Sequence, residues 1–120
     1  ELRHIREKSL LADEVLRPIL DDDEVLKFIR HKRERYDGTG HPGGLKGDLI
    51  PLGARVIAVV EAFDAITSGR PYRLPRLPEE ALEELQRCTP TQFDPQIVTV
   101  FADLYERIFR NINQFSIGIP

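Results

Sequence analysis

The chain has 120 residues, of which 41% are hydrophobic and 31% charged, which suits one compact soluble domain or a piece of one slightly larger domain. A net charge of −3 argues against a nucleic-acid-binding protein, and no apolar run approaches the roughly 20 residues that cross a bilayer. The single cysteine, Cys88, cannot form an internal disulfide, so we expect a small buried residue in a cytoplasmic protein.

The first third of the chain predicts two helices and a loop. From residue 5 to residue 19, apolar side chains recur at the spacing of one buried helix face. Three aspartates, Asp21 to Asp23, then supply an N-cap and negative charge for a second helix that we expect to reach about Arg35. Residues 36–50 hold five glycines and a proline, which predicts a loop.

Three prolines then mark the starts of three further helices, because proline is tolerated in a first helical turn. Pro51, Pro78 and Pro95 predict helices over about 51–67, 78–88 and 95–109. The first of these is apolar nearly all round and is expected at the centre of the fold. In the last, Val98, Phe101, Leu104 and Tyr105 are spaced as a core stripe. Without strand alternation anywhere, the prediction is an all-α domain over 1–110 with an extended tail over 111–120.

The segment "ERYDGTGHPGGLKGDLIPLGARVIAVVEAFDAITSGRPYR", residues 34–73, resembles the HD-GYP family, bacterial phosphodiesterases that linearise cyclic di-GMP. The family pattern reads HHE-x-x-DG-x-GYP, a GLKG-like loop, IPL-x-AR-I-IAVAD-x-YDA and D-RPY-[KR]. "TQFDPQIV" at 91–98 resembles a further family element, so the likeness spans about residues 10–107. It implies that residues 1–110 are the C-terminal portion of an HD-domain-like bundle of about five helices, without the N-terminal helices that carry the His-Asp dyad.

Several positions depart from the family pattern. Two adjacent metal-binding histidines fall on Lys32 and Arg33, an aspartate ligand on Glu61, and another ligand aligns with Lys8. The family uses transition-metal ions for hydrolysis, whereas ammonium and guanidinium groups are cations that cannot donate a lone pair to a metal. The resemblance with these departures implies a degenerate site with no catalytic residue and no metal or other cofactor. The tyrosine of GYP falls on His41.

Glu61 lies in the middle of an almost wholly apolar helix and is expected to be buried, where a carboxylate needs a counter-charge. We hypothesise that Lys32 or Arg33 takes the place of the metal charge beside Glu61; otherwise both cations point to solvent. Asp64 is expected to have a structural role, either capping or pairing with an arginine such as Arg55 or Arg70. The three histidines, His4, His31 and His41, lack the spacing of a metal-binding pair, so partly exposed structural positions are expected for the last two.

Two further segments suggest binding. By resemblance, Arg70 and Arg73 contact substrate phosphates, although Arg70 could equally tie the end of its helix to a neighbour. The glycine-rich loop is associated in the family with docking to diguanylate-cyclase (GGDEF) domains, and we expect Asp37 to stabilise its turn. The docking residues expected from the resemblance are Asp37, Gly38, Gly40, His41, Pro42, Gly43 and Gly44.

Three functions remain open from the sequence. The first is a degenerate HD-GYP module for signalling and protein interaction, with GGDEF or receiver-type domains as partners and no membrane or nucleic acid. The family often joins such domains to receiver domains and forms dimers, which implies a homodimer. The second is a non-hydrolysing sensor of cyclic di-GMP. The third is an active metal-dependent phosphodiesterase whose ligands come from residues upstream of Glu1.

Overall fold

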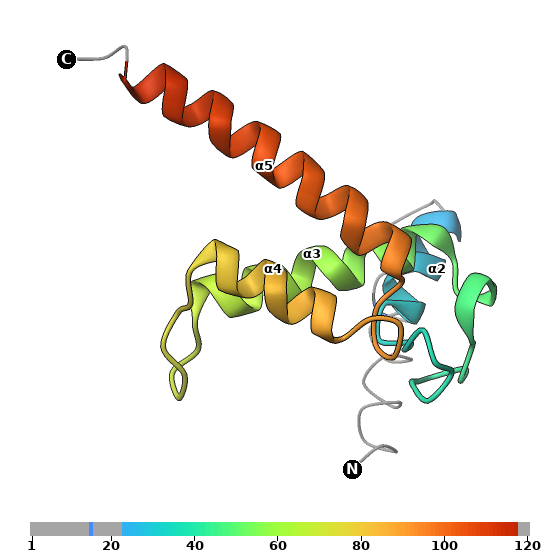
Figure 1. Ribbon diagram of the computed structural model, residues 1–120. Helices are drawn as coiled ribbons and strands as arrows, with labels where there is room; N and C mark the ends of the chain where they lie inside the picture. Colours follow the sequence, from blue (N-terminus) through green and yellow to red (C-terminus); the bar gives the residue numbers. More distant parts are fainter. Residues whose placement is uncertain (1–14, 16–22, 118–120) are drawn as a thin grey trace.

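The computed structural model describes residue 15 and residues 23–117, with side chains as far as residue 108. This part of the chain contains α2 (Asp23–His31), α3 (Leu52–Ser68), α4 (Pro78–Arg87), α5 (Pro95–Ile117) and the 3-10 helix η1 (Gly47–Leu49), and no β-strand (Figure 1). The all-α prediction is therefore confirmed. The helix predicted over 5–19 lies outside the described residues, apart from Val15, which is helical.

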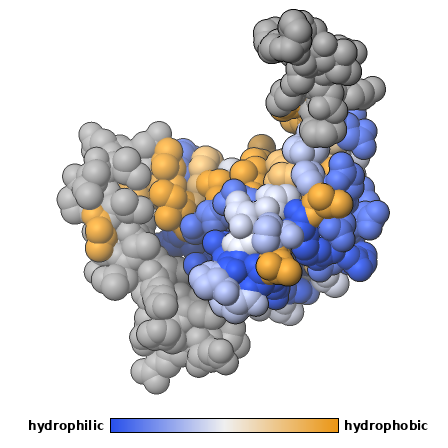
Figure 2. All heavy atoms as spheres, turned by 90° about the vertical axis from the view of Figure 1, so that its left-hand side faces the viewer, coloured by the Kyte–Doolittle hydropathy of each residue, from blue (hydrophilic) through white to orange (hydrophobic). Residues whose placement is uncertain are grey.

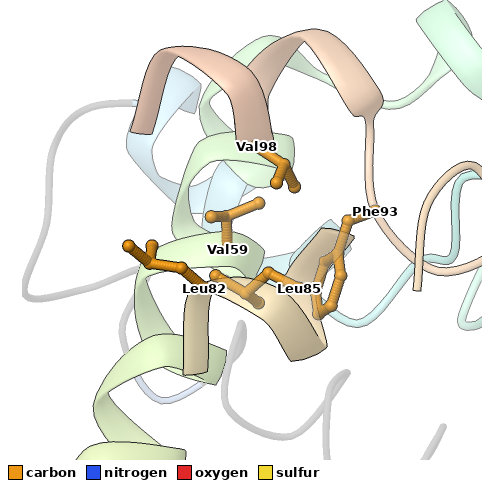
Figure 3. Packing of buried hydrophobic residues seen from close by; sticks show 5 residues of the cluster. All are labelled: Val59, Leu82, Leu85, Phe93 and Val98. Carbon is orange, nitrogen blue, oxygen red and sulfur yellow. The ribbon is translucent and has the colours of Figure 1, made fainter. Parts of the chain in front are cut away.

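Helix α3 lies at the centre of the described bundle, as its apolar composition predicted, because it contacts α2, α4 and α5. A core of five buried side chains joins α3 to α4 and α5 (Figure 3). At the other side, Gly53 allows α2 to approach closely, since a Cβ there would lie 2.4 Å from the Phe28 ring. The buried cluster consists of Val59, Leu82, Leu85, Phe93 and Val98, and half-buried Cys88 packs against it.

Helix α5 is held to α3 at its start and then projects away from the bundle (Figure 1). The Phe63 ring contacts the rings of Phe101 and Tyr105, with centroids 5.0 and 5.1 Å apart. Two predictions are wrong here. Leu104 is exposed, because it faces an open groove between α3 and α5 that Val56, Val60 and Val100 also line. Residues 111–117 are helical instead of extended, since neither glycine nor proline interrupts the sequence before Gly118.

The ends of the helices follow local signals except for that of α2. Pro51 and Pro78 sit at the N-cap and the first turn of α3 and α4, close to the predicted starts. Helix α2, however, ends at His31 and not near Arg35. The amides of Tyr36 and Asp37 donate to the carbonyls of Gln92 and Thr91, at 3.0 and 2.9 Å. These hydrogen bonds to a distant segment replace the helical ones, so that α2 ends before Arg35.

The surface of the molecule mixes polar and apolar regions. Figure 2 shows hydrophobic patches among a largely hydrophilic face. Several apolar side chains of α3 and α5 are exposed, among them Leu52, Val56, Val60, Val100 and Ile108. Within the described ranges, we found no helix with the length and apolar character needed to cross a membrane.

Candidate functional site

A cavity of about 430 Å³ opens between the segment after α2, the glycine-rich loop and the middle of α3. The segment contributes Lys32, Arg33, Glu34 and Arg35, and the end of α3 is followed by Arg70. Small side chains of α3 leave the space free. The cavity therefore has four cationic groups at its wall, and its remaining lining includes His41, Ala58, Glu61, Ala62, Ala65, Gln92 and Phe93.

Lys32 and Glu61 form the ion pair that the sequence suggested. Lys32 Nζ donates to Glu61 Oε1 at 2.8 Å across 29 positions of sequence. The expected burial of Glu61 is wrong, however, because its side chain is 56% exposed and that of Lys32 is 29% exposed. Glu61 lies at the wall of the open cavity, and an exposed pair of this kind contributes at most about 1 kcal/mol to stability.

The residues at these positions do not fit the transition-metal ions that the HD-GYP resemblance implies. An ammonium group 2.8 Å from Glu61 Oε1 supplies the positive charge beside that carboxylate. Neither it nor the Arg33 guanidinium has a lone pair to offer a metal. In residues 23–108, no group of three His, Cys, Asp or Glu side chains lies close enough to hold a metal ion. The remaining ligand position, Lys8, and His4 lie outside the described residues.

Arg55, one of the two arginines suggested as a partner of Asp64, pairs instead with Asp94. Its Nη1 donates to Asp94 Oδ2 at 2.8 Å, and the two side chains are only 15% and 4% exposed. The same Asp94 accepts from Gln96 N at 2.9 Å through Oδ1 and so caps α5. Asp64 is exposed and accepts a hydrogen bond from Ser68 at 3.2 Å. Of the partners suggested for Asp64, Arg55 is therefore not the one found, because its guanidinium points toward Asp94 at the start of α5.

Glu34 organises the glycine-rich loop, a role that the sequence did not reveal. Its side chain is 0% exposed. The amides of Gly43 and Leu45 donate to its two oxygens at 2.7 and 3.1 Å, and His31 Nδ1 donates to Oε2 at 2.9 Å. The signal that could have indicated this role is the glutamate four residues before Gly38 in the HHE-x-x-DG pattern.

The loop also contains its own supports. The Asp37 carboxylate accepts from the amide and hydroxyl of Thr39 at 3.0 and 2.6 Å, as its predicted turn-stabilising role required. These hydrogen bonds, together with nearby Arg35, hold the pKa of Asp37 below its ordinary value of 3.8. Gly40 packs against backbone, since a Cβ there would lie 2.3 Å from Arg35 N. Gly38 and Gly44 have positive φ angles of 85° and 64°.

The two arginines predicted to bind phosphate, Arg70 and Arg73, differ in their position relative to the cavity. Arg70 lines the cavity, whereas Arg73 is not part of the lining. The two are joined through their backbones, with N–H···O distances of 2.8 and 2.9 Å, and both side chains are exposed. His41 lines the cavity as well, and both of its ring nitrogens are buried with no hydrogen-bond partner in the described structure.

Comparisons with known proteins agree with this architecture. The model of the HD domain family matches residues 1–97. A cyclic di-GMP phosphodiesterase of Thermotoga maritima is 37% identical over 91 residues, which cover 76% of this chain and 24% of that protein. The cyclic di-GMP phosphodiesterase response regulator RpfG of Xanthomonas campestris pv. campestris is 41% identical over 92 residues, 77% of this chain and 24% of that regulator.

A solved structure is similar over nearly the whole chain. The crystal structure of a cyclic GMP-AMP-specific phosphodiesterase of Vibrio cholerae, V-cGAP3, aligns with a TM-score of 0.76 and 27% identity, covering 97% of this chain and 28% of that one. This chain thus spans about a quarter of the length of these relatives. It belongs to the HD domain family, and within that family to the HD-GYP group that its motifs resemble.

Proposed function

We propose that this chain is an HD-GYP domain that takes part in cyclic di-GMP signalling without hydrolysing the nucleotide. The observation that carries the proposal is the Lys32–Glu61 pair, 2.8 Å long, at two positions where the family pattern has metal ligands. Hydrolysis in the family needs a metal-activated hydroxide, and a lysine ammonium cannot replace that function. The fold and the loop are retained beside this site, which supports a binding role over a catalytic one.

The loop over residues 37–44 is the surface proposed for protein partners such as GGDEF or receiver-type domains. Glu34 and Asp37 fix its backbone through hydrogen bonds to Gly43, Leu45 and Thr39. A loop fixed in this way loses little conformational entropy on binding, which favours a docking function. A homodimer remains part of this proposal through the family resemblance.

A second candidate function is a sensor that binds a nucleotide without cleaving it. It is favoured by the 430 Å³ cavity, which lies within the usual size range of small-molecule sites. Arg33 and Arg70 at its wall are suited to bidentate contacts with phosphate oxygens. The two candidates are compatible, because the docking loop and the cavity share His41.

A hydrolysis assay tests the proposal. We expect the chain, supplied with Mn²⁺ or Fe²⁺, to form no linear product from cyclic di-GMP, because the donor atoms at Lys32 and Arg33 cannot hold the metal. The phosphodiesterase of Thermotoga maritima is the positive control under the same conditions. Metal-dependent turnover by this chain would overturn the proposal. Turnover only by a longer native protein containing it would favour the alternative in which upstream residues supply the ligands.

A further inference from the structure

We infer that the cavity is a metal-free binding site for a dianionic phosphomonoester, such as the terminal phosphate of a linear nucleotide, in preference to a cyclic phosphodiester. The inference rests on the proposed loss of hydrolysis and concerns the same cavity. It names the chemical class of ligand that the cavity's own side chains select. The metal ions that would otherwise neutralise a phosphate are replaced by the protein's cations.

The charges at the wall provide the first argument. Lys32, Arg33, Arg35 and Arg70 are opposed within the lining by Glu34 and Glu61 alone. Lys32 is engaged by Glu61 at 2.8 Å, and Arg35 Nε is 3.6 Å from Asp37. Even with Asp37 counted, the cavity wall keeps a positive charge. An anion entering it is attracted, and a divalent cation is repelled.

Unused hydrogen-bond donors provide the second argument. In residues 23–108, neither Arg33 nor Arg70 forms a side-chain ion pair or hydrogen bond. Both ring nitrogens of His41 are buried at the same cavity without a partner in the described part of the chain. Buried polar atoms without partners are rare in folded proteins and often mark a place for water, an ion or a ligand. The three side chains together offer two guanidinium forks and a ring N–H.

This set of donors fits a phosphomonoester better than a phosphodiester. A monoester has three terminal oxygens and carries up to two negative charges at neutral pH, whereas a diester has two free oxygens and one charge. Two forks and a further donor can therefore all find acceptors on the monoester. The cavity can also accommodate the rest of the ligand beside the phosphate, because Ala58, Ala62 and Phe93 form an apolar part of its wall.

Glu61 gives the inference a test with a definite sign. As long as Glu61 holds Lys32, that ammonium group is only partly available to an anion. Glu61→Gln removes a negative charge from the cavity and releases Lys32. The substitution should therefore tighten phosphate binding. A purely structural role of the ion pair would leave binding unchanged or weaken it.

The experiment is a calorimetric titration of the whole chain in buffer containing EDTA. Guanosine 5′-monophosphate and inorganic phosphate should bind, the nucleoside guanosine should not, and cyclic di-GMP should bind at least about tenfold more weakly than the monophosphate. Arg33→Ala and Arg70→Ala should each weaken monophosphate binding about tenfold. Glu61→Gln should strengthen it about threefold or more. Arg87→Ala, an exposed arginine paired with Glu84 outside the cavity, is the matched control and should change nothing.

Three outcomes would overturn the inference: no binding of the monophosphate at millimolar concentration, cyclic di-GMP binding as tightly as the monophosphate, or an unchanged affinity in both arginine variants. A parallel titration with Mn²⁺ in place of EDTA distinguishes failure of the ligand inference from failure of the proposed function. Monophosphate binding that requires Mn²⁺ would contradict both the metal-free ligand site and the proposed loss of the metal site. Absence of nucleotide binding in a chain that also binds no metal would contradict the ligand inference alone.

Discussion

Replacing Asp94 by alanine should lower the free energy of unfolding by about 3–5 kcal/mol, the usual cost of removing one partner from a buried ion pair. Asp94 is 4% exposed and lies 2.8 Å from Arg55 Nη1. Its loss leaves the guanidinium charge of Arg55 without its buried partner and also removes the N-cap of α5, which accepts from Gln96 N. Urea denaturation followed by far-UV circular dichroism measures the change.

Two further variants give this prediction its controls. Asp94→Asn keeps a side-chain oxygen for the cap but loses the negative charge, so its cost should be smaller than that of Asp94→Ala. Asp103→Ala removes an exposed carboxylate of the same helix that pairs with Arg107 at 3.0 Å, and its effect should stay below about 1 kcal/mol. Equal costs for Asp94→Ala and Asp103→Ala would contradict the assigned role of Asp94.

Glu34→Ala should lower the free energy of unfolding by about 3 kcal/mol and loosen the glycine-rich loop. Removal of the carboxylate leaves the amides of Gly43 and Leu45 without their acceptor, and hydrogen bonds to a charged group are each worth about 1.5–3 kcal/mol. His31 loses its partner as well. Amide hydrogen exchange at Gly43 and Leu45, measured alongside the unfolding transition, reports the loop directly.

The matched control for Glu34 is Glu83→Ala, because Glu83 is an exposed glutamate of α4. It should change stability by no more than about 0.5 kcal/mol. Glu34→Gln retains an acceptor oxygen and should have an intermediate effect. If exchange at Gly43 and Leu45 were as slow in Glu34→Ala as in the parent chain, Glu34 would not be the group that holds the loop.

The features that could be predicted from the sequence are those with local signals or a family pattern. Prolines at residues 51, 78 and 95 mark helix starts within a residue or so of the observed ones, because the missing N–H of proline costs nothing in a first turn. The Lys32–Glu61 pair could be predicted because the family pattern places both positions at one metal site. The pattern thus supplied a long-range contact that periodicity cannot.

What could not be predicted depends on contacts between distant segments. Arg55 and Asp94 are 39 residues apart, and nothing in the local sequence favours that partner over Asp64. The end of α2 is set by backbone bonds to residues 91 and 92, which override helix propensity. Glu61 was expected to be buried because its helix is apolar, yet Val56 and Val60 of the same helix are exposed too. Apolar composition therefore did not decide which face of α3 meets solvent.

The central claim is that Lys32 and Arg33 replace a metal site, and metal binding by the chain tests it most directly. After incubation with Mn²⁺ and desalting, elemental analysis should find no Mn²⁺ above background in the parent chain. A variant carrying Lys32→His, Arg33→His and Glu61→Asp restores three metal-donating side chains and should bind Mn²⁺ at least about tenfold more tightly. One or more equivalents of Mn²⁺ retained by the parent chain, with no gain in the variant, would contradict the claim.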